Sequence, residues 1–313
     1  MALKKTATAT NTATAKKAPP SELTARICVG TTRGAAQSVD VLPNGAGFVL
    51  ASFAGVWLID SAGVFKRELR ANKGTVCWNA RVTRDGTRII AGFGDQKFEV
   101  WEIKSGKQTC SLGTSSEIVT RVSSSADGKR AVTASLNTTV RLWDVVAGKE
   151  LAAKTFPKSF AISAAISADG GAAFCGGTDG VLRCIDVEGD QEVWATPGAG
   201  WIEDIDASAE GGIVVAGGRG KALHVYDAAS GKKLRSCELG ANITMVGVSP
   251  DGRFATALAG KRSPPVWDVK TGKAIATLAG HDGGLRSIRF SGDSRTIATT
   301  DDGKTTRLFD LPR

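Results

Sequence analysis

One short signal recurs seven times in the chain: a strand-forming apolar run that ends in an acidic residue. The acids recur every 41 or 42 residues and are Asp60, Glu102, Asp144, Asp186, Asp227, Asp268 and Asp310. A polar turn runs in phase with this signal, as at Asp85-Gly86 and Asp127-Gly128. Asp-Gly pairs tolerate the positive φ of tight hairpin turns, and short apolar runs flank each turn. Each unit is therefore predicted to hold four short strands.

Four strands in a unit of about 42 residues is the size of one β-propeller blade. A single four-stranded sheet cannot bury both of its faces, whereas seven sheets stacked around an axis can. Seven such units account for nearly all of the 313 residues, which overrides the two domains expected from length alone. The sequence therefore predicts an all-β fold, a seven-bladed β-propeller of four-stranded antiparallel blades over residues 21–313.

The repeats resemble those of the WD40-repeat family. The family's Trp-Asp step is matched at Trp101-Glu102, Trp143-Asp144 and Trp267-Asp268, and its Gly-His step at Gly280-His281. The resemblance implies a structural role for Trp101, Trp143, Asp144, Trp267, Asp268 and His281. It also implies a buried network of His, Ser or Thr, Asp and Trp in a blade, but no blade of this sequence shows all four. The residues that replace the Trp elsewhere are Ile59, Ile185, Tyr226 and Phe309.

The two ends of the chain carry separate predictions. Residues 1–20 hold four lysines, no acid and mostly Ala and Thr, so we expect a disordered basic arm. The seventh unit reaches its acid at Asp310, three residues before the sequence ends, and so lacks an outer strand. Residues 21–29 have the apolar rhythm of an outer strand. We therefore expect this N-terminal strand to close the ring by joining the last blade.

The sequence carries no signal for a membrane or for secretion. No stretch approaches the roughly 18 unbroken apolar residues of a membrane span, and the N-terminus lacks the apolar core of a secretory signal. We therefore expect a soluble, cytoplasmic protein without membrane contact.

The six cysteines form no CxxC pair and none lies near a histidine in the sequence. This pattern disfavours zinc and favours reduced thiols that pack as small hydrophobic groups. A two-residue turn at Asp179-Gly180 would place Cys175 opposite Cys184 across a hairpin, where the Cα atoms come closest. A redox-labile disulfide there is the alternative to two packed thiols.

Catalytic signatures are missing from the sequence, which has no P-loop, no G-x-S-x-G elbow and no H-E-x-x-H motif. His224 and His281 belong to different units and cannot supply a metal cluster. We therefore expect no enzyme, no cofactor and no bound metal. An enzymatic, quinoprotein-like propeller is the third alternative. It would need several charged or His side chains around the axis, and we expect few there from this sequence.

The expected docking site is the face on which the first strand of each unit begins, because propellers of this resemblance commonly bind peptides or proteins there. The residue nine positions before each inner turn is apolar in units two to five: Val76, Ile118, Phe160 and Trp201. Arg121 and Arg286 lie near this row and can orient a partner. A contiguous apolar row with an exposed Trp favours an interface, the alternative being packing between blades. The sequence thus predicts a scaffold for one or more proteins or peptides, a monomeric propeller within a larger complex.

The turns of the opposite face carry basic residues: Arg84, Lys107, Lys129, Arg130, Lys149, Lys232 and Lys273. Acids such as Asp85 and Asp127 lie between them, so a solvated surface of mixed charge is the simpler interpretation. The alternative is binding of nucleic acid or a ribonucleoprotein through this basic face and the N-terminal arm. No aromatic residues lie among these basic residues, so stacking on single strands is not expected.

Overall fold

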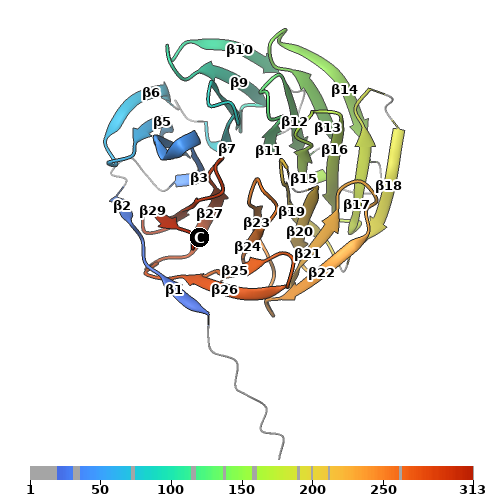
Figure 1. Ribbon diagram of the computed structural model, residues 1–313. Helices are drawn as coiled ribbons and strands as arrows, with labels where there is room; N and C mark the ends of the chain where they lie inside the picture. The colour runs from blue at the N-terminus through green and yellow to red at the C-terminus, as the bar shows by residue number, and fades with distance from the viewer. Residues whose placement is uncertain are drawn as a thin grey trace, which may run out of the picture.

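The computed structural model is a ring of β-sheets around a central axis (Figure 1). It describes residues 20–312 except 31–35, 72–74, 114–117, 137–138, 157–160, 189–190, 199, 211 and 261–262. The predicted basic arm lies almost wholly outside these residues, so its boundary at residue 20 stays a prediction. Across the described ranges, no helix is long and apolar enough to cross a membrane. The helical element among them is the short 3-10 turn η1 (Pro43–Gly45).

Seven sheets form the seven blades, and the strands of each blade follow one another from the axis to the rim. The innermost strands are β3 (Ala36–Val41), β7 (Cys77–Val82), β11 (Val119–Ser124), β15 (Ala161–Ile166), β19 (Ile202–Ala207), β23 (Met245–Val248) and β27 (Leu285–Phe290). The second strands are β4 (Gly47–Ser52), β8 (Arg88–Phe93), β12 (Arg130–Ser135), β16 (Ala172–Gly177), β20 (Ile213–Gly218), β24 (Phe254–Leu258) and β28 (Thr296–Asp301).

The third strands are β5 (Gly55–Asp60), β9 (Lys97–Glu102), β13 (Thr139–Asp144), β17 (Val181–Asp186), β21 (Ala222–Asp227), β25 (Pro265–Asp268) and β29 (Thr305–Asp310). The outer strands of blades one to six are β6 (Phe65–Ala71), β10 (Gln108–Gly113), β14 (Lys149–Thr155), β18 (Gln191–Pro197), β22 (Lys233–Glu238) and β26 (Lys273–Leu278). Strand β2 (Ile27–Gly30) is the outer strand of blade seven. These antiparallel blades confirm the predicted seven-bladed, all-β propeller.

Apolar side chains fill the spaces between neighbouring blades, because each sheet has a neighbour on both faces. Strand β4 shows this most simply, since it is buried at all six positions. Val49 and Ala51 of blade one pack with Ile89 and Trp101 of blade two in a single cluster. The core is therefore a series of inter-blade layers arranged around the ring.

Side-chain to backbone hydrogen bonds connect the innermost strands of neighbouring blades. In each bond a short polar side chain accepts the N–H of a residue one blade further on, at 2.8 to 3.4 Å. The pairs are Ser38–Ala80, Asp40–Val82, Asn79–Val122, Ser123–Ile166, Ser163–Ile205, Asp204–Val246, Asp206–Val248 and Ser287–Val39. The last pair joins blade seven to blade one. We call these bonds the axial ring.

The N-terminal segment closes the ring over a shorter stretch than predicted. Strand β2 pairs antiparallel with β29, and the N–H of Arg26 donates to the carbonyl of Leu308 at 2.7 Å. Residues 21–29 are not one strand, however, because β1 (Ser21–Leu23) pairs in parallel with β26 as a fifth strand of blade six. Leu23 and Ala25 pack against the apolar cluster shared by blades six and seven, which accounts for the split. The segment therefore ties two blades together.

The hairpin at Asp179-Gly180 differs from its prediction by one residue. Strands β16 and β17 pair Phe174 with Cys184 and Cys175 with Arg183, across a three-residue loop in which Gly180 has a φ of 71°. A one-residue change of register moves a side chain to the opposite face of a sheet. Cys175 thus packs between blades three and four, and Cys184 between blades four and five. The expected facing of the two thiols is wrong, and both are free and buried.

Deleting residues 1–30 removes β1 and β2, so we expect a large loss of stability or aggregation through the exposed edges of β26 and β29. Deleting only residues 1–19 is the matched control and should leave the thermal midpoint unchanged. Thermal unfolding followed by circular dichroism measures the difference. If both truncated proteins melt at the same temperature, closure by this segment is wrong.

Candidate functional site

Among the described residues, four large apolar side chains are exposed on the face where the innermost strands begin, here called the upper face. They are Phe53, Trp78, Leu136 and Trp201, and they lie at the starts of innermost strands or in loops between second and third strands. Phe53 and Trp78 pack edge to face, with ring centroids 6.5 Å apart. Other large exposed apolar side chains are scattered over the lower turns and outer strands: Val64, Val146, Leu151 and Val193.

The structure places the predicted apolar row only in part on this surface. Trp201 is 40% exposed, whereas Val76 and Ile118 are half-buried beside the starts of β7 and β11. Phe160 lies outside the described residues. The N–H of Leu136 donates to the carbonyl of Ile118 at 3.2 Å, so an exposed Leu lies directly beside that position.

Counting nine residues back from the inner turn did not identify Trp78, because most innermost strands begin with a β-bulge. In blade two the pairing of β7 with β8 shifts between Cys77 and Asn79, and Trp78 is the extra residue. Equivalent shifts leave Gln37 and Arg286 as extra residues in blades one and seven. Bulges re-aim side chains. The sequence did offer one signal for this residue, because an aromatic side chain stands two positions after Val76.

The bulged residues meet at the upper end of the axis, where they line a cavity of about 450 Å³, here called the mouth. The mouth is lined by Gln37, Trp78, Arg121, Thr244, Met245, Leu285, Arg286 and Asp302. Arg286 forms an ion pair with Asp302, and both side chains are exposed. The structure therefore brings the two predicted arginines, Arg121 and Arg286, together with the unpredicted Trp78.

Trp201 has a fixed neighbour on the upper face. The guanidinium carbon of Arg219 lies 3.6 Å from the centroid of the Trp201 ring, and Arg219 Nε lies 3.3 Å from Glu203 Oε1. A cation over an aromatic face is attracted by the ring quadrupole. The contact holds the indole in one orientation while part of it remains open to a partner.

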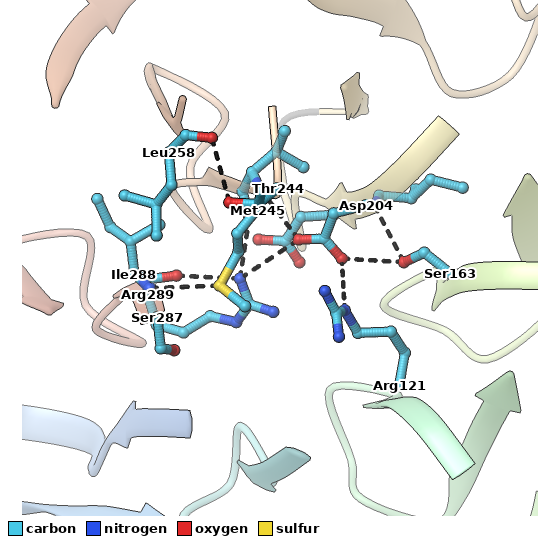
Figure 2. Close-up of polar contacts among 12 residues, drawn as sticks. Arg121, Ser163, Asp204, Thr244, Met245, Leu258, Ser287, Ile288 and Arg289 are labelled. Carbon is cyan, nitrogen blue, oxygen red and sulfur yellow. Dashed lines mark hydrogen bonds and ion pairs between the residues drawn. The ribbon is translucent and has the colours of Figure 1, made fainter. Parts of the chain in front are cut away.

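Below the mouth, charged side chains gather around the axis, although the sequence analysis expected few there. They are Asp40, Arg81, Arg121, Asp204, Asp206 and Arg289. Figure 2 shows Arg121 and Arg289 directed toward Asp204 from two sides. The expectation failed because these residues are far apart in sequence and only the closed ring brings them together.

The axial carboxylates take part in the structure of the ring. Asp204 accepts hydrogen bonds from Arg121 Nε at 2.9 Å, Ser163 Oγ at 3.0 Å and the N–H of Val246 at 2.9 Å. Although burial raises the pKa of Asp204, Arg121 and Arg289 outweigh it and hold that pKa below its ordinary value. Asp204 is therefore an ionised, saturated acceptor rather than a free acid or base.

Asp40 and Arg81 form a second axial pair. Arg81 Nε lies 3.3 Å from Asp40 Oδ2, and its Nη2 lies 3.7 Å from Asp206 Oδ1. Burial raises the pKa of Asp40 despite the nearby Arg81. For Arg81 the carboxylates outweigh the effect of burial and raise its pKa, so the guanidinium stays charged.

The lower face is mixed in charge. Arg84 pairs with Glu210, Arg130 with Glu188 at 2.8 Å and Lys129 with Asp127 at 3.6 Å. The other predicted basic residues are exposed next to the turns between third and outer strands: Lys107, Lys149, Lys232 and Lys273. Acids thus lie against part of the predicted basic face.

The residues assigned to the repeat lie at the ends of the third strands or beneath them. Trp101, Trp143 and Trp267 are buried, and Trp143 Nε1 donates to Thr133 Oγ1 at 2.9 Å. Asp144 and Asp268 instead accept backbone N–H groups of their own turns, from Val146 at 2.9 Å and Thr271 at 2.7 Å.

His281 lies buried above the core of blade seven. Its Nε2 is 2.8 Å from Thr299 Oγ1, and its ring centroid is 5.4 Å from that of Phe309. Within the described part of the chain, no group of three or more His, Cys, Asp or Glu side chains is placed to hold a metal ion.

Seven blades around an axial ring, each built on four antiparallel strands, define a seven-bladed β-propeller. The family model "WD domain, G-beta repeat" matches residues 106–144 and 272–310, each match ending at the acid that closes a third strand. The chain therefore carries WD40 repeats, which confirms the resemblance. Because the first match begins just before β10 and ends with β13, and the second begins just before β26 and ends with β29, each repeat spans two blades.

Two curated relatives match about a quarter of the chain. It is 33% identical over 78 residues to Nuclear distribution protein PAC1 of Arthroderma otae, which covers 25% of this chain and 16% of that protein. It is 38% identical over 76 residues to WD repeat-containing protein 1 of Bos taurus, a match that covers 23% of this chain and 12% of that protein. The matched region thus spans less than a fifth of either relative. A structure described as "Crystal Structure of Mitotic Checkpoint Complex" shares the fold, with a TM-score of 0.82 at 14% identity over 100% of this chain and 98% of that one.

Replacing Asp204 by Ala leaves Arg121 and Arg289 without their shared carboxylate and Val246 without an acceptor. We expect a loss of about 3–5 kcal/mol in the free energy of unfolding, as for other broken buried pairs. Asp302→Ala breaks the exposed pair with Arg286 and should cost about 1 kcal/mol or less. Urea unfolding of both variants measures the difference, and equal losses would contradict the structural role of Asp204.

Acid should destabilise the propeller. Hydrogen bonds from turn residues hold the pKa of Asp127, Asp169, Asp227 and Asp268 below the ordinary 3.8, and Asp204 is lowered by its arginines. A carboxyl with a lowered folded pKa contributes stability above its unfolded pKa and loses it as the pH falls through the folded pKa. Asp40, whose pKa is raised, acts with the opposite sign. We expect the urea midpoint to fall between about pH 5 and about pH 2; a constant or rising midpoint would contradict this.

Proposed function

We propose that this propeller is a non-enzymatic scaffold that binds a protein or peptide on its upper face, as one propeller within a larger complex. The observation that carries the proposal is that Trp78, exposed and packed against the exposed Phe53, lines the mouth of about 450 Å³ on the face that also exposes Leu136 and Trp201. Exposed apolar groups collected beside a cavity are typical of interaction sites. Trp78 and Trp201 are the anchors in this proposal, because aromatic residues dominate interface energetics.

The comparisons support this class of function. The relatives' names are a WD repeat protein and a nuclear distribution protein, and neither name is that of an enzyme. The solved structure with the shared fold is that of a complex. Rigidity supports it further, since the axial ring holds the strand starts in place before a partner arrives and so reduces the entropy lost on binding.

Arg121 and Arg286 give the mouth its polar contacts in this proposal. Arg286 is the more available of the two, because its side chain is exposed and its partner Asp302 is exposed as well. Arg121 is committed to the fully buried Asp204 at 2.9 Å. We therefore assign Arg286 to partner orientation and Arg121 mainly to support of the mouth.

Trp78→Ala and Trp201→Ala should each weaken partner binding by about 30-fold or more, the size of an interface hot spot. Val146→Ala is the matched control, because Val146 is 62% exposed on a lower turn. Quantitative affinity capture from source cells identifies proteins retained by wild type, and calorimetry with a purified partner measures the affinity. Thermal midpoints should stay within a few degrees of wild type. Unchanged affinity in both Trp variants, or equal loss in Val146→Ala, would contradict an upper-face site.

A further inference from the structure

Blade seven has a His, a Thr, an Asp and a Phe at four positions that recur from blade to blade, and the His contacts the Thr and the Phe. His281 lies four residues before β27, and its Nε2 is 2.8 Å from Thr299, the fourth residue of β28. Asp301 is the sixth residue of β28, and Phe309 is the fifth of β29, with its ring 5.4 Å from that of His281. The fourth residue of the second strand also forms a side-chain hydrogen bond in blade three, where Thr133 accepts the Trp143 indole N–H at 2.9 Å.

Blade five has the same strand lengths but small residues at three of these four positions. They are Gly198, Ala216 and Gly218, in place of the His, Thr and Asp of blade seven. Tyr226 is the fifth residue of β21 and takes the place of Phe309. Its hydroxyl has no threonine to bond it, because Ala216 stands at the threonine position. Its neighbour two residues earlier on the same face of β21 is His224.

The missing side chains leave a small cavity in blade five, here called the blade-five pocket. Its walls include Gly198, Ala216, Gly218 and Trp201, and its polar side chains are His224 and Tyr226. The volume is about 10 Å³, close to the roughly 10–15 Å³ that one water molecule needs. Among its described lining residues there is no Asp, Glu, Lys or Arg, so an ion would find no opposite charge there.

Two buried polar atoms at the pocket, Tyr226 Oη and His224 Nε2, have no hydrogen-bond partner among the described residues. His224 is fixed through its other nitrogen, which lies 2.9 Å from Ser236 Oγ. Burial raises the pKa of Tyr226 to about 12 and lowers the pKa of His224, so both groups are neutral near pH 7. Buried polar groups are expensive to leave unpaired. Together these atoms match a small neutral molecule that both donates and accepts hydrogen bonds.

We propose that the blade-five pocket is a binding site for one water molecule, which bridges Tyr226 Oη and His224 Nε2 in place of the side chains that blade seven supplies. The pocket shares Trp201 with the surface proposed for the upper-face partner, but the water itself is held by Tyr226 and His224. The site depends only on the size of the pocket and on the two polar atoms that face it.

Tyr226→Phe tests the proposal by the sign of its effect. If water bonds the hydroxyl, the variant loses a hydrogen bond, and we expect the thermal midpoint to fall by about 1–2 °C. If the hydroxyl is instead unpaired, the variant removes a buried unsatisfied group, and the midpoint rises. A rise would overturn the proposal.

Ala216→Ser adds one oxygen atom at the position where blade three has Thr133. We expect this hydroxyl to replace the water and to keep or raise the thermal midpoint. Ala298→Ser is the matched control, because Ala298 is fully buried among apolar side chains of blades seven and one and should lose stability. Equal losses in the two variants would overturn the proposal.

A crystal structure of the wild-type protein at a resolution that shows ordered water is the direct measurement. We expect one density peak within about 3.2 Å of both Tyr226 Oη and His224 Nε2. That peak should be missing in Ala216→Ser. A wild-type pocket without a peak would overturn the proposal, whatever the thermal midpoints show.

Discussion

The axial ring is the interaction on which the rest of this propeller depends. Each innermost strand is the edge of its sheet, and N–H groups on that edge are buried against the preceding blade. Unpaired buried N–H groups are rare in native proteins because each costs about as much as a lost hydrogen bond. Short polar side chains one blade earlier supply the acceptors, from Ser38 through to Ser287, whose Oγ accepts the N–H of Val39 at 3.3 Å. The ring therefore sets the spacing of the blades and, with it, the positions of the bulged residues at the mouth.

Two blades depart from this pattern at the first acceptor position of the innermost strand. Met245 and Arg121 occupy positions where other blades have Ser, Asn or Asp. Met245 still accepts the N–H of Ile288 through its sulfur at 3.3 Å, but a guanidinium cannot accept a hydrogen bond at all. Arg121 instead reaches Asp204, which serves Val246 as well. The buried carboxylate thus serves both the guanidinium of Arg121 and the backbone of the next blade.

The fold could be predicted from the sequence because its pattern is periodic, whereas the site could not where a single residue decides the register. A step of 41 or 42 residues repeated seven times leaves little choice of architecture. By contrast, one extra residue in a hairpin loop moved Cys175 and Cys184 to opposite faces, and one bulged residue brought Trp78 to the surface. Leu23 and Ala25 split the closing segment through contacts with two blades, which no local pattern in the sequence records. A constant repeat spacing thus predicts a repeat fold, whereas the position of each site residue depends on the local register of its strand.

The seven blades show how far this fold separates architecture from local chemistry. Blade three holds its third strand with a Trp–Thr bond, blade seven with a His and a Thr beside a Phe, and blade five with a Tyr above a small pocket. Because each blade contacts mainly its two neighbours, the loss of one such group has mainly local effects. The axial ring runs on through blade five, from Ser163 to Ile205 and from Asp204 to Val246. Blade five can therefore dispense with its own network while still presenting Trp201 at a fixed place on the upper face.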